Sequence, residues 1–148
     1  MENFEVCVRA IIRSRGKILV CFHKEKGVYF FPGGHLNFGE SISEALKREI
    51  KEELGIAIKK FSLVGMVDNI YEEGDKKHHE INLVFNVKVN KITDKSKENH
   101  IEFIFFDKKR FLKEKVLPIA LQKAILKWQK DKKFFWASQI KEKIFFHK

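Results

Sequence analysis

Residues 40–55, with the sequence ESISEALKREIKEELG, constrain the fold of this chain more than any other stretch. Ser41 followed by Glu44 matches a capping box at the start of a helix, and Gly55 is a typical helix stop. The apolar side chains recur at the helical period on one sector: Ile42, Leu46, Ile50 and Leu54. The segment therefore predicts an amphipathic helix with one face buried in a core.

A second sector of this helix carries three carboxylates, those of Glu49, Glu52 and Glu53. On a helical wheel they lie beside the apolar sector, at the rim of the buried face. Like charges at this spacing repel each other, and semi-buried carboxylates take up protons unless cations compensate them. Hard oxygen ligands at this density suit Mg²⁺ or Mn²⁺. The alternative is a solvated acidic face balanced by the neighbouring lysine and arginine side chains.

The loop before the helix, FPGGHLNFGE, contains Gly33, Gly34 and Gly39. Glycines let the backbone approach a ligand or a metal ion closely, because no Cβ stands in the way. A carbonyl group from this loop can therefore join the carboxylates around a cation.

Gly34, Glu40 and the run from Arg48 to Ile56 together resemble the Nudix box, G-x5-E-x7-R-E-U-x-E-E-x-G-U, where U is a bulky aliphatic residue. Every specified position matches. The resemblance implies a Nudix-type α/β/α sandwich with a central mixed β-sheet, as a single domain over residues 1–148. It also implies a metal-dependent hydrolase that cleaves nucleoside diphosphates linked to another moiety X.

Carried over from the family, Glu52 and Glu53 resemble metal ligands. Glu49 resembles either a ligand or the group that deprotonates the attacking water. The carbonyl of Gly34 resembles the family's backbone ligand. This agrees with the chemistry of the reaction, since metal ions neutralise phosphate charge and a nearby carboxylate can accept the proton of water.

Further roles follow from the same resemblance. Arg48 and Glu40 look like the pair that orients the carboxylates. Members often add a carboxylate from outside the box, and Glu98 and Glu102 in KENHIEF are the candidates here. Glu80 in HHEINLVF is a weaker one. Residues of these three kinds are more often surface or strand-edge residues than ligands.

Apolar, β-branched runs predict strands or extended pieces at 4–13, 17–22, 27–34, 61–71, 79–89 and 101–107. The segment EEGDKKH, between the fourth and fifth of these runs, predicts a polar loop. Pro118 opens a second amphipathic helix. The aromatic and basic end, FFWASQIKEKIFFHK, has no assignment.

The hydrophobic fraction of 44% and charged fraction of 34% suit a soluble globular protein. No apolar run is long enough to span a membrane, and the first residues do not resemble a signal peptide. Cys7 and Cys21 lie in strand-like runs with no His or Cys at ligand spacing beside them. We expect buried free thiols in a reducing cytoplasm.

The net charge of +10 favours phosphate-bearing partners, although a lysine-rich composition alone explains it equally well. The basic, aromatic end, with Phe134, Phe135 and Trp136, fits RNA binding or a homodimer contact. The acidic segment 34–56 contrasts with the rest of this basic chain. A cation site for a polyanionic substrate needs such a segment.

The substrate-binding residues lie outside the box. His23 and Lys24 are candidates for phosphate contacts. Candidates for a nucleobase pocket, with core packing as the alternative for the aromatic ones, are Phe22, Tyr29, Asn69 and Tyr71. His78 and His79 are expected to face solvent and to bind no metal, with a substrate contact as the alternative. The leading function is hydrolysis of a (deoxy)nucleoside triphosphate to monophosphate and pyrophosphate. The alternatives are an RNA 5′-end pyrophosphohydrolase and a non-catalytic nucleotide-binding Nudix domain.

Overall fold

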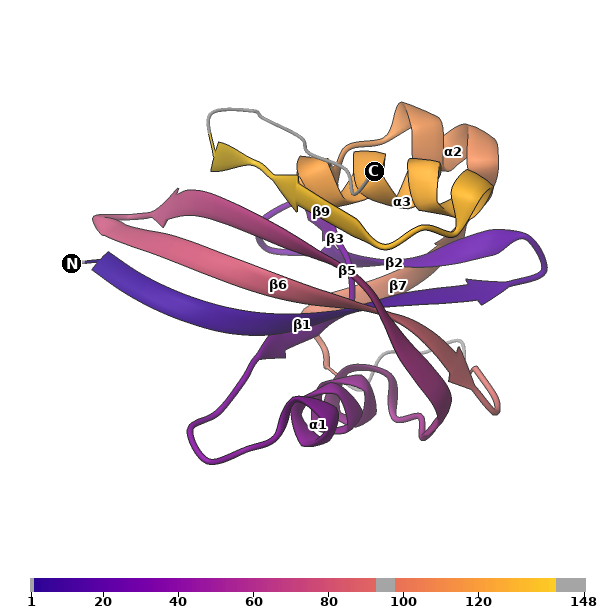
Figure 1. Cartoon of the computed structure of the whole chain (residues 1–148), viewed down its shortest axis with the longest axis horizontal. Coiled ribbons are helices and arrows are strands. Elements are labelled where there is room, and N and C mark those ends of the chain that lie inside the picture. The colour runs from indigo at the N-terminus through magenta and orange to yellow at the C-terminus, as the bar shows by residue number, and fades with distance from the viewer. Residues whose placement is uncertain (1, 93–97, 141–148) are drawn as a thin grey trace.

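The computed structural model describes residues 2–92 and 98–140 (Figure 1). The strands are β1 Glu2–Ser14, β2 Lys17–His23, β3 Val28–Phe30, β4 Gly33–His35, β5 Ile58–Glu73, β6 Lys76–Val89, β7 Ile101–Phe106, β8 Val116–Leu117 and β9 Phe135–Ser138. The helices are α1 Ile42–Leu54, α2 Lys108–Lys113 and α3 Ile119–Asp131.

The strands form one mixed, curled sheet with the order β8-β3-β2-β1-β6-β5-β9, while β4 pairs with β1 and β7 with β2. β1 runs parallel to β6 and antiparallel to β2 and β4. The strands lie between α1 on one side and α2 and α3 on the other (Figure 1). The predicted α/β class, with helices on both sides of a central mixed sheet, is confirmed.

Two hydrophobic cores fill the spaces between the sheet and the helices. The core under α1 includes Val8, Ala10, Leu19, Ala45, Leu46, Ile50 and Leu54. The core under α3 includes Ile11, Val20, Phe31, Val84, Leu121 and Ile125. The predicted apolar face of α1 is confirmed except at Ile42, which is 41% exposed because it lies in the first turn.

The predicted polar loop over 72–78 is wrong. β5 continues to Glu73 and β6 begins at Lys76, so the connection is a tight turn around Gly74, which has a φ of 64°. The pairs Tyr71↔His78 and Glu73↔Lys76 extend the ladder into this polar stretch. Polarity misled the prediction because residues 72–77 are exposed, and a strand end that is surrounded by solvent tolerates charged side chains.

The structure also contains elements that the sequence did not predict. α2 follows Asp107, whose carboxylate caps it by accepting a hydrogen bond from the Arg110 N–H at 2.8 Å. β9 pairs in parallel with β5, and a Cβ on Gly65 would fall 2.3 Å from the Phe135 ring. The end of the aromatic, basic tail, residues 141–148, lies outside the described residues.

Cys7 and Cys21 are buried free thiols, as expected. None of the helices in the described ranges combines the length and apolar character that a membrane crossing requires.

Candidate active site

The local sequence fixes where α1 begins and ends, and thereby where its glutamates lie. Ser41 Oγ accepts a hydrogen bond from the Glu44 N–H at 3.1 Å, and the Glu44 carboxylate accepts one from the Ser41 N–H at 2.9 Å. Gly55 adopts a left-handed conformation and donates its N–H to the Lys51 carbonyl. The predicted capping box and helix stop are confirmed.

Arg48 joins the loop to the helix. Its Nε lies 2.6 Å from Glu40 Oε1 and its Nη2 lies 3.0 Å from Glu40 Oε2, so the pair is bidentate. Nη2 also donates to the His35 carbonyl at 2.8 Å, and Nη1 donates to Glu49 at 2.8 Å and to Glu52 at 3.3 Å. The hydrogen bond from Arg48 lowers the pKa of Glu40. One guanidinium thus holds three box carboxylates, those of Glu40, Glu49 and Glu52, and the preceding backbone in a fixed relation.

The three clustered glutamates of α1, Glu49, Glu52 and Glu53, differ in burial. Glu53 is only 4% exposed, whereas the Glu52 side chain is 52% exposed. The expectation that all three occupy the rim of the buried face is therefore wrong for Glu53. Its Oε1 accepts a hydrogen bond from the Gly33 N–H at 3.2 Å, and the Cys21 thiol lies 3.8 Å from Oε2. The position of Glu53 next to the apolar sector places it between the helix and the sheet.

The charge around Glu53 favours a positive partner at this carboxyl. Burial raises the pKa of Glu53 to about 8; the charge of Arg9 opposes this shift, and the charges of Glu49 and Glu98 add to it. Glu98 therefore lies close enough to act on Glu53, while Glu102 is an exposed residue of β7. A buried carboxyl beside other carboxylates favours either a proton or a metal ion.

Glycines bring the backbone of β4 against these carboxylates. A Cβ on Gly34 would fall 2.5 Å from the Glu49 carboxylate, so the two groups are in contact only because Gly34 has no side chain. A Cβ on Gly33 would fall 1.9 Å from the Val8 carbonyl oxygen, and Gly33 has a φ of 143°. Neither glycine can be replaced without movement of its neighbours.

The donor set fits a hard divalent cation, because it combines carboxylates with a backbone carbonyl. Within the described residues, no three of the box carboxylates place ligand atoms within 4.8 Å of one another. Mg²⁺ does not require this, since it binds through one or two carboxylates together with waters and substrate phosphates.

A cavity of about 690 Å³ opens beside the glycines of β4. Its apolar lining residues are Val28, Phe30, Leu117 and Pro118. Its polar lining residues include Arg9, His23, His35, Asn69, Glu80 and Gln139. A cleft of this size with a mixed lining matches a small-molecule site.

Three of the six predicted substrate-binding residues, His23, Asn69 and Tyr71, line this cavity. Tyr29 is not among the lining residues. Its ring packs edge-on against Phe106 with the centroids 5.1 Å apart, and its hydroxyl accepts a hydrogen bond from Arg110 at 3.2 Å. Tyr29 therefore has the core-packing role that the sequence left open for it.

One buried network holds Asn69 at the cavity. Asn82, which is 0% exposed, accepts from Arg9 at 3.0 Å and donates to Asn69 Oδ1 at 2.9 Å and to the Val67 carbonyl at 3.3 Å. Arg9 also donates to the Phe31 carbonyl at 3.1 Å. Because Asn69 Oδ1 accepts the hydrogen bond from Asn82, the NH₂ group of Asn69 is not used in this contact.

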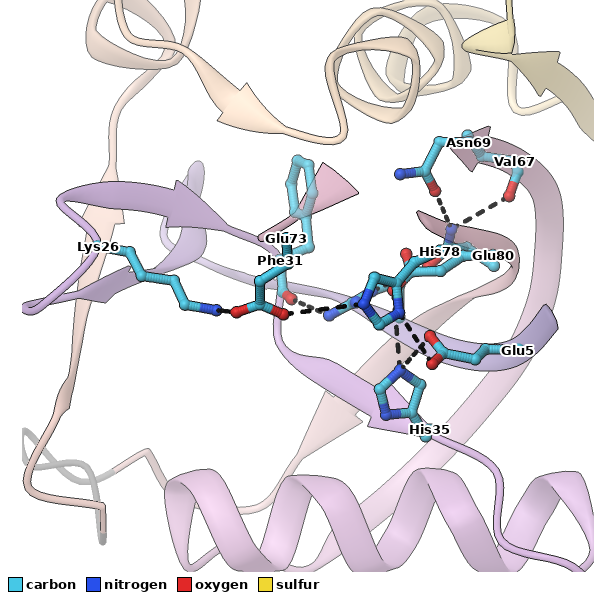
Figure 2. Close-up of polar contacts among 11 residues, drawn as sticks. Glu5, Lys26, Phe31, His35, Val67, Asn69, Glu73, His78 and Glu80 are labelled. Carbon is cyan, nitrogen blue, oxygen red and sulfur yellow. Dashed lines mark hydrogen bonds and ion pairs between the residues drawn. The ribbon is translucent and has the colours of Figure 1, made fainter. Parts of the chain in front are cut away.

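A second network crosses the same face of the sheet (Figure 2). Glu5 Oε1 lies 3.1 Å from His78 Nδ1, and Glu5 Oε2 lies 2.8 Å from His35 Nε2. At the other end of the network, Lys26 Nζ lies 2.8 Å from Glu73 Oε1. The solvent-facing position expected for His78 is wrong, because it is 8% exposed and stacks on Tyr71 with the centroids 4.7 Å apart.

His35 has a strongly perturbed imidazole. Hydrogen bonds to Cys7 and Glu80 raise the pKa of His35 to about 11, although burial opposes this shift. Glu80, the weakest of the predicted carboxylates, is 5% exposed and lines the cavity.

Glu5, Arg9, His35 and Asn82 were not predicted as site residues, and all of them lie on this polar face. The available signal was the alternation of Glu5, Cys7 and Arg9 in one strand and of polar residues at positions 78, 80 and 82 in another. Only the parallel register, in which Glu5 pairs with Glu80 and Cys7 with Asn82, shows that these two series share one face.

Comparisons with known proteins give the family of the chain. A family model for the NUDIX domain matches residues 3–129. The ADP-ribose pyrophosphatase of Methanocaldococcus jannaschii is 34% identical over 122 residues, which cover 74% of this chain and 71% of that protein. The 8-oxo-dGTP diphosphatase of Buchnera aphidicola is 38% identical over 61 residues, which cover 40% of this chain and 49% of that protein.

Solved structures share the fold. The crystal structure of a MutT protein from Methanosarcina mazei Go1 has a TM-score of 0.68 and 27% identity, and the match covers 89% of this chain and 97% of that one. A MutT protein from Bacillus halodurans gives a TM-score of 0.72 at 22% identity, covering 90% and 88%. With the family model, the similar sequences and the Nudix box in agreement, this chain belongs to the NUDIX family and is a Nudix hydrolase.

Proposed function

We propose that the chain is a Mg²⁺- or Mn²⁺-dependent pyrophosphohydrolase that converts a (deoxy)nucleoside triphosphate to its monophosphate and pyrophosphate. This proposal rests on one observation: the carboxylates of Glu49 and Glu53 contact the two glycines that line the cavity. Gly33 and Gly34 line the cavity, Gly33 donates its N–H to Glu53, and the carboxylate of Glu49 lies against Gly34. A nucleotide bound there has its phosphates beside the acidic groups.

Glu52, Glu53 and the Gly34 carbonyl are the proposed ligands of the divalent ion. Glu98 is the proposed ligand from outside the box, ahead of Glu102, because its charge acts on Glu53 while Glu102 is exposed. The bound ion supplies neutralisation of phosphate charge and acidification of water.

The chain's own groups carry the rest of the reaction. Glu49 accepts the proton of the attacking water as that water forms a bond to phosphorus and the phosphoanhydride P–O bond breaks. The electron pair of the broken bond leaves with the pyrophosphate. Arg48, which holds Glu49 at 2.8 Å, is proposed to position this carboxylate rather than to take part in proton transfer.

The cavity offers groups that suit a nucleoside. Phe30 and Leu117 give apolar surfaces for a base. The NH₂ group of Asn69, oriented by Asn82, can donate to a carbonyl or ring nitrogen of the base. His23 and Lys26 line the same cavity and can contact phosphate.

ADP-ribose is the second candidate substrate. The similarity to a protein named ADP-ribose pyrophosphatase extends over 74% of this chain and favours it. ADP-ribose contains the same phosphoanhydride bond, so the proposed roles of the box residues do not change between the two substrates.

A product assay tests these proposals. Purified protein with Mg²⁺ is given the deoxynucleoside triphosphates, 8-oxo-dGTP or ADP-ribose, with Glu53→Gln as the matched control. Pyrophosphate and a monophosphate, absent with the variant, are the expected products. AMP and ribose 5-phosphate as the only products would replace the first candidate with the second. No product from any of these substrates with Mg²⁺ or Mn²⁺ would contradict both.

A further inference from the structure

Cys7, His35 and Glu80 bring three different metal-binding groups together. The thiol sulfur, an imidazole nitrogen and a carboxylate oxygen all lie within 4.8 Å of one another. Among the described residues, this is the only set of three His, Cys, Asp or Glu side chains that converges so closely. The spacing of residues along the chain did not indicate this set, because no histidine stands near Cys7.

Three neighbouring strands hold these side chains in place. His35 of β4 pairs with Cys7 of β1, and Glu80 of β6 pairs with Glu5 of β1 on the same face. Cys7 is 0% exposed and Glu80 is 5% exposed, so packing fixes both. A site on paired strands keeps its geometry better than a site on a loop.

The ligand types select the class of ion. Thiolate and imidazole ligands favour Zn²⁺ or Co²⁺, whereas Mg²⁺ prefers oxygen. One thiolate and one carboxylate together balance the charge of a divalent ion. His35 and Glu80 also line the cavity, so a fourth coordination position on that side is accessible to water or a ligand.

The carboxylate of Glu5 adds a further preference for positive charge at the cluster of Cys7, His35 and Glu80. Its Oε2 lies 2.8 Å from His35 Nε2, yet this buried oxygen accepts no hydrogen bond of normal geometry within the described residues. A metal ion bound among these side chains would satisfy Glu5 Oε2 better than the edge of the His35 imidazole does.

We propose that Cys7, His35 and Glu80 form a second metal site for a thiophilic divalent ion such as Zn²⁺, separate from the hard-cation site at Glu53. This inference does not depend on which nucleotide the enzyme hydrolyses. Because His35 directly follows Gly34, an ion bound here also fixes the strand that carries the backbone ligand of the hard-cation site.

Cobalt absorption tests the site directly. Reduced, chelator-treated protein is titrated with Co²⁺, and the thiolate-to-cobalt charge-transfer band in the near ultraviolet is followed. One equivalent is expected to produce the band, and Zn²⁺ is expected to abolish it. The band should be lost in Cys7→Ser and kept in Cys21→Ser, which removes the other buried thiol. It should also be kept in Glu53→Gln, which alters the hard-cation site.

A second test measures Zn²⁺ affinity by calorimetry and uses a variant that does not disturb the core. The side chain of His35 is 54% exposed, so His35→Gln is expected to fold normally. It should weaken Zn²⁺ binding by about 10–100-fold, as should Glu80→Gln. Unchanged affinity in His35→Gln would overturn the proposal. A cobalt band that depends on Cys21 rather than Cys7 would also overturn it.

Discussion

At the scale of single residues, the buried carboxyl of Glu53 links proton binding to metal binding. Its pKa is raised to about 8 by burial, so in the metal-free protein it carries a proton through most of the neutral range. A carboxylate ligand must be deprotonated before it coordinates a cation. Protons and divalent ions therefore compete for this one side chain.

The first prediction concerns Mn²⁺ affinity as a function of pH. Below about pH 8, each unit of acidification should weaken binding by about tenfold, because one proton must leave Glu53 for each ion bound. Above pH 8 the affinity should become level. Calorimetry between pH 6 and 9 measures this, with proton release followed in buffers of different ionisation enthalpy. An affinity that is flat from pH 6 to 8 would contradict it.

The second prediction concerns stability without metal. The folded pKa of Glu53 lies above its ordinary value of 4.5, so folding favours the protonated form and stability falls as the pH rises from about 4.5 to about 8. Glu53→Gln mimics the neutral carboxyl. At pH 8 with chelator it should melt at least about 3 °C above the parent protein, the effect of about 1 kcal/mol in a domain of this size. The difference should disappear near pH 4.5.

The third prediction contrasts two adjacent glycines. Gly33→Ala places a methyl group 1.9 Å from a backbone oxygen at an unfavourable φ, so it should lower the free energy of unfolding by at least about 3 kcal/mol. Gly34→Ala meets only the end of the Glu49 side chain. It should leave stability nearly unchanged and reduce turnover by about 10–100-fold, because Glu49 must move. Thermal melts and kcat values on both variants distinguish the two effects.

At the scale of elements, α1 and the loop before it act as one unit because Arg48 ties them together. Arg48 contacts Glu40 and the His35 carbonyl in the loop, and Glu49 and Glu52 on the helix. The planar guanidinium makes all these contacts at once, which a lysine ammonium cannot do.

The fourth prediction follows from this geometry. Arg48→Lys keeps the charge but loses the bidentate pair with Glu40, so turnover should fall by about 10–100-fold while the melting temperature changes little. A parallel measurement on Lys47→Arg, which alters a neighbouring residue outside the pair, should show near-normal kcat. Equal losses in both variants would mean that the effect is not specific to the Arg48 contacts.

The elements also show what the sequence could and could not predict. α1, its caps and its carboxylates were predicted because the signals for them lie within 16 consecutive residues, 40–55. The polar face of the sheet was not, because it combines β1 with β6 through a register that no local pattern contains. The polar ends of β5 and β6 have the composition of a loop because residues 72–77 are exposed, and only their pairing across the turn shows that they are strands.

At the scale of the whole molecule, the site joins parts that are distant in the chain. The proposed ligands come from β4, from α1 and from residue 98, and the cavity adds groups from β1, β5 and β6. The substrate could not be predicted from the box because the cavity residues lie outside it. The RNA partner and the homodimer suggested by the basic, aromatic end stay predictions.

The fifth prediction concerns removal of the metal. An ion that binds only the folded protein, present at 100 times its Kd, stabilises it by about 2.7 kcal/mol. Chelation should therefore lower the melting temperature at pH 8 by about 5–10 °C. The same chelator should have little effect on Glu53→Gln. A melting temperature that does not respond to Mg²⁺ or Mn²⁺ in the parent protein would contradict metal binding at this site.

The parallel pairing of β1 with β6 has a consequence for biosynthesis. Phe4 pairs with His79 and Val8 with Leu83, so β1 leaves the ribosome well before the strand with which it pairs. Contacts between such distant segments slow folding and leave strand edges unpaired meanwhile. The Gly34 backbone is held against Val8 of β1. The candidate active site therefore forms only after β6 has been translated, and the nascent chain is expected to need protection from aggregation until then.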